Sequence, residues 1–134
     1  MALLREYKEI AYQWGIWKTE ESTEELLALL PDPERYEQQL TRFSSPHRKL
    51  EWLSVRVLLY QLLGEEKIIE YAPSGKPRLA DSSYFISISH TRGYVAVILS
   101  PRSEVGIDIE QYGQRVHKVA HKYMRPDELI SEYQ

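Results

Sequence analysis

The sequence contains no cysteine, and this absence excludes a disulfide framework and any metal site built on thiolates. It also lacks an apolar run that approaches the roughly 18 residues of a membrane span. The opening residues, MALLREYKEIAYQ, do not contain the apolar core of a secretory signal peptide. We therefore expect a cytoplasmic protein that does not bind membranes.

A strong charge of either sign is also missing. The formal net charge of the 134 residues is −3 and the pI is about 5.8, so the chain creates no general field that would attract a polyanion. Bulk binding to nucleic acid is thereby disfavoured, and contacts with phosphate must come from a local basic cluster. With 43% hydrophobic and 28% charged residues, residues 1–134 have the composition and length of one soluble domain.

Residues 105–110 alternate strictly between apolar and other side chains. In a β-strand the two isoleucines would face the core, whereas Asp108 and Glu110 would face the other way together with Gly106. The Cα atoms of these two acidic residues would lie roughly 6.5 Å apart, which suits one hard cation such as Mg²⁺, and the glycine would leave room for a ligand. The alternative is that Asp-Ile-Glu is the exposed face of an amphipathic edge strand.

Residues 84–99 predict a β-hairpin with a polar tip. Alternation along its first strand puts His90 on the same face as two isoleucines and Ser89 on the opposite face. The tip, Ser-His-Thr-Arg-Gly, supplies hydroxyls, an imidazole and a guanidinium, a combination suited to phosphate. Ordinary turn polarity is the alternative interpretation.

Three helices are predicted between the first strand and this hairpin. A capping box at residues 22–25 opens a short leucine-rich helix, and Asp-Pro at 32–33 begins a second one. Ser-Pro at 45–46 begins a longer helix that ends before Gly64. The alternation of residues 9–17 predicts the first strand.

The apolar spacing of residues 114–123 predicts a helix after the 105–110 strand. His117 and His121 would lie one turn apart on it, but no carboxylate on that helix completes a zinc site, so surface histidines are the preferred interpretation. A further helix is predicted to begin at Arg125. We expect an α+β fold, in which an antiparallel sheet built from the first strand, the hairpin and the 105–110 strand packs its apolar face against the long helix.

Four segments of the sequence occur together in a characteristic order. They are the helix Arg48–Leu59 and the motifs Gly75-Lys76-Pro77, Ile88-Ser89-His90 and Val105-Gly106-Ile107-Asp108-Ile109-Glu110. This combination covers nearly the whole chain and resembles the N-terminal half of the 4′-phosphopantetheinyl transferases of the surfactin-synthetase-activating type. The resemblance implies a 4′-phosphopantetheinyl transferase-like half as the fold. It also implies that Asp108 and Glu110 are catalytic and bind Mg²⁺, and that coenzyme A is bound by Arg56, Lys76, Ser89 and His90.

The activity implied by the resemblance is transfer of the 4′-phosphopantetheine arm of coenzyme A to a serine of an acyl or peptidyl carrier protein, as in fatty acid or secondary-metabolite biosynthesis. The family continues into a second half, in which a Trp-x-x-Lys-Glu helix completes the metal site, and this motif does not occur here. We therefore expect the 134-residue chain to be inactive alone. We also expect it to expose an apolar surface that favours a homo-oligomer.

Two other functions are compatible with the same residues. The chain could be a module that binds coenzyme A or a nucleotide without turnover. It could also be a metal-dependent phosphohydrolase that uses Asp108, Glu110 and a histidine, although the sequence shows no denser group of carboxylates.

Overall fold

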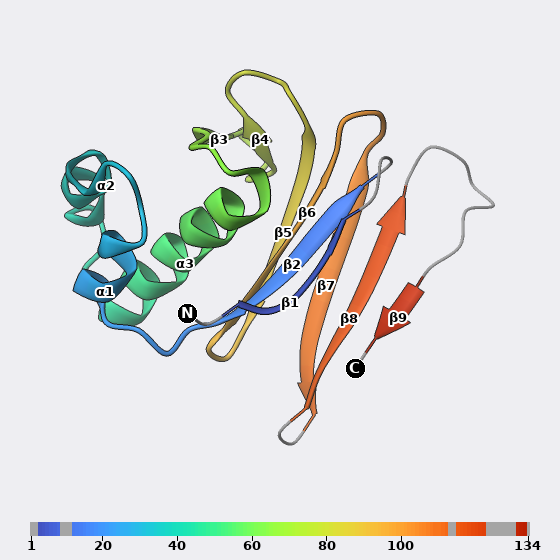
Figure 1. Ribbon diagram of the computed structural model, residues 1–134, viewed down its shortest axis with the longest axis horizontal. Helices are drawn as coiled ribbons and strands as arrows, with labels where there is room; N and C mark the ends of the chain where they lie inside the picture. The colour runs from blue at the N-terminus through green and yellow to red at the C-terminus, as the bar shows by residue number, and fades with distance from the viewer. Residues whose placement is uncertain (1–2, 9–11, 113–114, 123–130, 134) are drawn as a thin grey trace.

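The computed structural model of the chain describes residues 3–8, 12–112, 115–122 and 131–133. Helices, a four-stranded sheet and a three-stranded sheet follow one another across the molecule (Figure 1). The helices are α1 (Thr23–Ala28), α2 (Pro33–Leu40) and α3 (Pro46–Leu63). The strands are β1 (Leu3–Lys8), β2 (Gln13–Lys18), β3 (Ile69–Tyr71), β4 (Pro77–Leu79), β5 (Phe85–Thr91), β6 (Tyr94–Ser100), β7 (Val105–Tyr112), β8 (Arg115–Lys122) and β9 (Ser131–Tyr133). Helices packed with antiparallel strands agree with the expected α+β class. Among the described residues, no helix is both long and apolar enough to cross a membrane.

Helices α1 and α3 begin at predicted capping serines and α3 ends at the predicted glycine, whereas Asp32 at the start of α2 makes no capping hydrogen bond through its side chain. Ser22 Oγ accepts a hydrogen bond from the Glu25 amide at 3.2 Å, and Glu25 Oε1 accepts one from the Ser22 amide at 2.9 Å, so the capping box is present. Ser45 Oγ accepts from the Arg48 amide at 3.4 Å at the start of α3. Gly64, with φ of +73°, ends α3 in the left-handed conformation that glycine adopts without strain.

Helix α3 lies close to the four-stranded sheet because β2 has a glycine beneath it. A Cβ atom at Gly15 would lie 2.8 Å from Leu58 Cδ1 and 3.2 Å from Leu62 Cδ2. Leu58 is fully buried, so it has little freedom to move away. The absence of a side chain at residue 15 therefore sets the separation of helix and sheet.

The four-stranded sheet has the order β1-β2-β6-β5, and all its neighbours are antiparallel. The predicted hairpin is present as β5 and β6, joined through Gly93 with φ of +74°. Strand β2 begins at Gln13, so the first predicted strand is shorter than expected, and residues 9–11 lie outside those described. Strand β1 was not predicted from the sequence.

Both faces of this sheet are apolar. On one face, Trp17, Val95 and Val97 belong to the core shared with the helices. On the other face lie the residues that pack with the isoleucines of β7, namely Trp14, Ile16, Ala96 and Ile98. A sheet with two apolar faces needs a cover on each.

Strand β7 provides the second cover, and this corrects the predicted sheet. The 105–110 strand does not join the hairpin in one sheet, because β7 belongs to a separate sheet with the order β7-β8-β9. Ile107 and Ile109 are buried, whereas Asp108 and Glu110 are exposed. The predicted division of this strand into an apolar and an anionic face is therefore confirmed.

The helix predicted at residues 114–123 is wrong, because Arg115–Lys122 form β8. Its register places His117 opposite Glu110 and His121 opposite Gly106, so the two histidines lie about 13 Å apart along a strand. The backbone amides and carbonyls along β7 need partners, and pairing them in a ladder outweighs a weak helical period. The helix predicted from Arg125 lies outside the described residues.

Candidate functional site

A groove of about 570 Å³ opens between the first half of α3, the β3–β4 turn and the end of β5. We call it the arginine groove, because Arg42, Arg48 and Arg56 all line it, together with Trp52, Tyr71 and His90. It collects basic and aromatic side chains from four separate segments of a chain whose net charge is −3. The local basic cluster that phosphate binding requires is thus present.

Arg56 is the most buried charged residue of the groove, with 7% of its surface exposed. Its guanidinium lies 3.9 Å from the centroid of the Trp52 ring and donates hydrogen bonds to the Trp52 carbonyl at 3.3 Å and the Tyr71 hydroxyl at 3.5 Å. No carboxylate among the described residues forms an ion pair with it. Burial lowers the pKa of Arg56, since water no longer solvates the charge. A buried cation with no counter-ion is well suited to an anionic ligand.

Arg42 and Arg48 lie at the mouth of the groove on either side of the chain bend that precedes α3. The guanidinium carbon of each lies 5.7 Å from the centroid of the Phe43 ring. Within the described part of the chain, neither arginine pairs with a carboxylate. Neither arginine is among the predicted binding residues. Arg48 lies eight residues before Arg56, about two helical turns, but a charged residue on an amphipathic helix is more often solvated surface.

His90 is held at the rim of the groove by a carboxylate of α3. Its Nδ1 lies 3.3 Å from Glu51 Oε2, and the same oxygen lies 3.2 Å from His47 Nε2. This contact involves the Nδ1 atom of His90, and the Nε2 atom takes no part in it. The structure thus brings His90 and Arg56, two of the predicted binding residues, to one groove.

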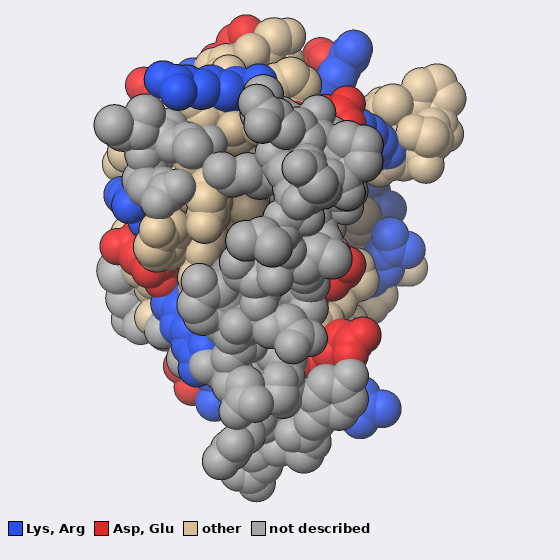
Figure 2. Space-filling view, turned by 90° about the vertical axis from the view of Figure 1, so that its right-hand side faces the viewer, with Lys and Arg blue, Asp and Glu red and all other residues tan. Residues whose placement is uncertain are grey.

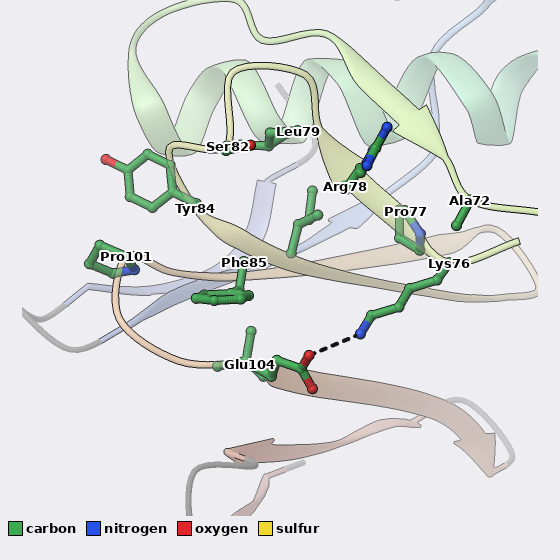
Figure 3. A pocket seen from close by; sticks show the side chains of 12 residues that line it. Ala72, Lys76, Pro77, Arg78, Leu79, Ser82, Tyr84, Phe85, Pro101 and Glu104 are labelled. Atoms are coloured by element: carbon green, nitrogen blue, oxygen red, sulfur yellow. Dashed lines mark hydrogen bonds and ion pairs between the residues drawn. The ribbon is translucent and has the colours of Figure 1, made fainter. Parts of the chain in front are cut away.

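Lys76 lies outside the arginine groove. Its neighbours Gly75 and Pro77 line the groove, but its own side chain is exposed and pairs with Glu104, with Nζ 3.4 Å from Oε1 (Figure 3). This ion pair spans a second cavity of about 340 Å³, to which Phe85 also contributes. The two cavities adjoin at Pro77.

Ser89 does not face the groove, because alternation along β5 turns it away from His90. Its Oγ accepts a hydrogen bond from the Ile109 amide at 3.2 Å, and Ser87 Oγ accepts one from the Ile107 amide at 3.3 Å. The structure therefore separates Ser89 from the predicted phosphate residues and attaches it to β7.

Asp108 and Glu110 project from β7 on its exposed face. The described residues contain no group of three His, Asp or Glu side chains that could hold a metal ion. Two carboxylates two residues apart supply the hard oxygen donors that Mg²⁺ prefers, and Mg²⁺ commonly completes its shell with water and substrate oxygens. These residues fit a shallow Mg²⁺ site that depends on further ligands.

Figure 2 shows the molecule from one side, where described basic and acidic side chains both lie around the area occupied by residues that the structure does not describe. Charges of both signs among the described residues agree with the net charge of −3.

Comparisons with known proteins identify relatives of one kind. No protein-family model matches the chain. A protein of Synechocystis, slr0495, provisionally named a 4′-phosphopantetheinyl transferase, is 28% identical over 100 residues, which are 66% of this chain and 41% of that protein. The 4′-phosphopantetheinyl transferase AcpT of Salmonella typhi is 38% identical over 64 residues, which are 47% of this chain and 33% of AcpT, and AcpT of Escherichia coli K12 matches equally well. The chain thus spans well under two thirds of the length of these relatives.

Proposed function

Given that the chain belongs to the 4′-phosphopantetheinyl transferase superfamily, we propose that it binds coenzyme A and takes part in transferring the 4′-phosphopantetheine arm to a carrier protein. The observation that carries this proposal is the burial of Arg56, which forms no ion pair with a carboxylate of the described residues, in a groove with two further arginines. An anion desolvated against three guanidinium groups would form charge-assisted hydrogen bonds, and bidentate pairing of arginine suits a phosphate group.

The groove is proposed to bind the nucleotide end of coenzyme A. Its 3′-phosphate would lie against Arg56, Arg48 and the Nε2 atom of His90. Tyr71, whose surface is 52% exposed at the groove, offers a ring on which adenine could stack. A nucleotide would thus satisfy both the basic and the aromatic side chains of the groove.

Lys76 is proposed to exchange partners when coenzyme A binds. Its ion pair with Glu104 is exposed, with 62% and 55% of the two side chains accessible, and such surface pairs contribute about 1 kcal/mol or less. The ammonium group can therefore leave Glu104 at small cost and contact the pyrophosphate. The turn between Gly75 and Pro77 restricts the backbone at Lys76 and so limits the range of positions that its ammonium group can reach.

Asp108 and Glu110 are proposed to hold Mg²⁺. When bound, that ion would neutralise charge developing on the pyrophosphate. In the transfer, the hydroxyl oxygen of the carrier serine passes its proton to a general base outside the residues assigned here and forms a bond to the β-phosphorus. The bond from that phosphorus to the bridging oxygen breaks, and 3′,5′-ADP leaves with the electron pair. Arg56 and His90 would keep the departing nucleotide in place while the Asp108 strand fixes the reacting end.

Transfer by this chain alone is not part of the proposal. Among the described residues, Asp108 and Glu110 are joined by no third ligand, and the Trp-x-x-Lys-Glu motif implied by the resemblance does not occur in the sequence. We propose that a further segment or partner supplies these groups. Self-association of this chain cannot supply a motif that it lacks. A cytoplasmic location, where coenzyme A and carrier proteins meet, completes the proposal.

The proposal is tested by titrating coenzyme A into the protein with and without Mg²⁺, followed by an assay of apo carrier protein for the mass of the added arm. We expect binding that Mg²⁺ strengthens and no transfer by the 134-residue chain. Failure to bind coenzyme A would reject the proposal, and transfer by this chain would reject its incompleteness.

A binding module without turnover is the second candidate, favoured because no third His, Asp or Glu among the described residues joins Asp108 and Glu110. The two candidates differ when the chain is extended by a segment that carries the Trp-x-x-Lys-Glu motif. An extended protein that binds coenzyme A but still modifies no carrier protein would identify a binding module.

A further inference from the structure

Two serines of β5 hold the backbone of β7. The amide of Ile107 donates to Ser87 Oγ at 3.3 Å, and the amide of Ile109 donates to Ser89 Oγ at 3.2 Å. Both contacts join residues that are 20 positions apart, so the two strands run parallel here with a constant alignment. Ser87 and Ser89 are successive residues on one face of β5, and they match successive inward amides of β7.

The two serine hydroxyls accept the hydrogen bonds that, in a β-ladder, the backbone carbonyls of a neighbouring strand would accept. Strands β5 and β7 belong to different sheets, so no backbone ladder between them fixes their alignment. Ile107 and Ile109 are 3% and 5% exposed, and a buried amide without an acceptor is costly. The serine hydroxyls therefore satisfy two donors that the contact between the sheets would otherwise leave without partners.

The alignment has a consequence for the carboxylates. Asp108 lies between the two amides that the serines hold, and the same offset of 20 residues sets Glu110 level with His90. Resting on the proposed function, we propose that Ser87 and Ser89 are positioning residues, which hold β7 so that its carboxylates lie beside the end of β5 that carries the phosphate-binding histidine. A shift of β7 by two residues would keep its apolar face buried but would move the carboxylates by about 6.6 Å.

This role differs from direct contact between Ser89 and the ligand. The hydroxyl accepts from β7 on the face of β5 opposite to His90, so its loss acts first on the carboxylate strand. Removing it should weaken the part of coenzyme A binding that depends on a divalent cation. The affinity for 3′,5′-ADP without metal, which depends on the arginine groove, should change less than twofold, about the error of comparing two titrations.

The direct test is amide hydrogen exchange measured by NMR on the full chain. We expect Ser87→Ala to speed exchange at Ile107 more than at Ile109, and Ser89→Ala to do the reverse, each by about tenfold at its own amide. Ser→Thr at either position keeps the hydroxyl and should restore protection. Ser83→Ala is the matched control, because that hydroxyl contacts Asp81 in the loop before β5.

Each single variant keeps one of the two serine hydroxyls, so the test does not require a protein that folds without both. Wild-type protection of both amides in Ser87→Ala and Ser89→Ala would overturn the proposal. It would also be overturned if Ser89→Ala weakened 3′,5′-ADP as much as coenzyme A with Mn²⁺, because this would place the hydroxyl on the ligand. If the wild-type protein binds no coenzyme A, the proposed function fails, while exchange at Ile107 and Ile109 still decides whether the serines hold β7.

Discussion

The arginine groove and the exposed face of β7 differ in how each holds its charged side chains. In the groove, Arg56 is 93% buried, stacks on Trp52 and donates to two fixed oxygens. On β7, Asp108 and Glu110 are exposed, and their strand is joined to β5 through serine hydroxyls. The groove is built from packed side chains, whereas the carboxylates depend on the placement of one strand.

This difference predicts that the groove and the two carboxylates respond differently to a ligand. A guanidinium that is already desolvated and oriented loses little entropy when an anion arrives, so the groove is preorganised for an anionic ligand, which we propose to be the nucleotide end of coenzyme A. A pair of exposed carboxylates gains its cation only with help from water and substrate oxygens. The chain should therefore recognise the nucleotide end of coenzyme A by itself, and it should hold Mg²⁺ well only when the pyrophosphate is present.

The largest expected effect comes from Arg56→Met, which removes the buried charge but keeps much of the volume. We expect the affinity for coenzyme A to fall by about 100-fold, or about 2.7 kcal/mol, with folding stability unchanged or higher because no uncompensated cation remains buried. Calorimetry and thermal unfolding measure the two. Arg78→Met is the control, since Arg78 is exposed and pairs with Glu70. An equal loss for dephospho-coenzyme A, which lacks the 3′-phosphate, would contradict the assigned contact.

A substitution on β7 should affect the dependence of coenzyme A binding on a divalent cation and leave the contact with the 3′-phosphate intact. Asp108→Asn should remove the strengthening of coenzyme A binding by Mn²⁺, about tenfold or more for a metal ligand, and leave 3′,5′-ADP binding and thermal stability unchanged. In an extended protein that carries the Trp-x-x-Lys-Glu motif, the proposed Mg²⁺-dependent transfer should be lost in the same variant. The control is Glu70→Gln, which alters a carboxylate remote from β7. A variant that keeps the Mn²⁺ effect would show that Asp108 is not a ligand.

Gly15→Ala tests the packing on which the groove depends. Its Cβ would meet Leu58 beneath α3, and overpacking of this kind costs about 1–3 kcal/mol, measured as a lower midpoint of urea unfolding. Because α3 carries Arg56, coenzyme A affinity should fall as well. Adding Leu58→Val, which shortens the contacting side chain, should recover part of both losses. Unchanged stability in Gly15→Ala would show that helix and sheet are less tightly packed than described.

The smallest expected effect is confined to alkaline pH. Burial raises the pKa of Tyr36 to about 12 from 10.0, and its hydrogen bond to Glu66 adds to the shift. The raised pKa stabilises the folded state fully below pH 10, and this contribution is lost as pH rises from about 10 to about 12. Tyr36→Phe should therefore flatten the fall in unfolding free energy across that range. Parallel pH profiles for variant and wild type would exclude this tyrosine as the cause.

The sequence predicted elements whose signals are local. The capping box at Ser22, the end of α3 at Gly64 and the hairpin of β5 and β6 each depend on a few neighbouring residues, and all are present. The partner of β7 could not be predicted in this way. Its alternation fixes which side chains face inward but not which sheet receives them, and residues 115–122 carry a pattern compatible with either helix or strand.

The site shows the same division between local and distant information. Arg56 and His90 were placed by motif, but Arg42 and Tyr71 enter the groove from segments that no spacing connects to them. Ser89 and His90 are adjacent in the sequence and were assigned together to the ligand. In β5 the two side chains point to opposite faces, because successive side chains of a strand alternate. Only His90 therefore lines the groove.

NMR mapping of 3′,5′-ADP on the isotopically labelled chain, with 5′-AMP as the reference ligand, tests the proposed role of the arginine groove most directly. Chemical-shift changes should concentrate at Trp52, Arg56, Tyr71 and His90, and they should be much smaller with 5′-AMP, which lacks the 3′-phosphate. Signals from the second cavity, such as those of Phe85 and Leu79, should remain unchanged. Shifts centred on the second cavity, or equal responses to the two nucleotides, would contradict the assignment of the arginine groove to the nucleotide end of coenzyme A.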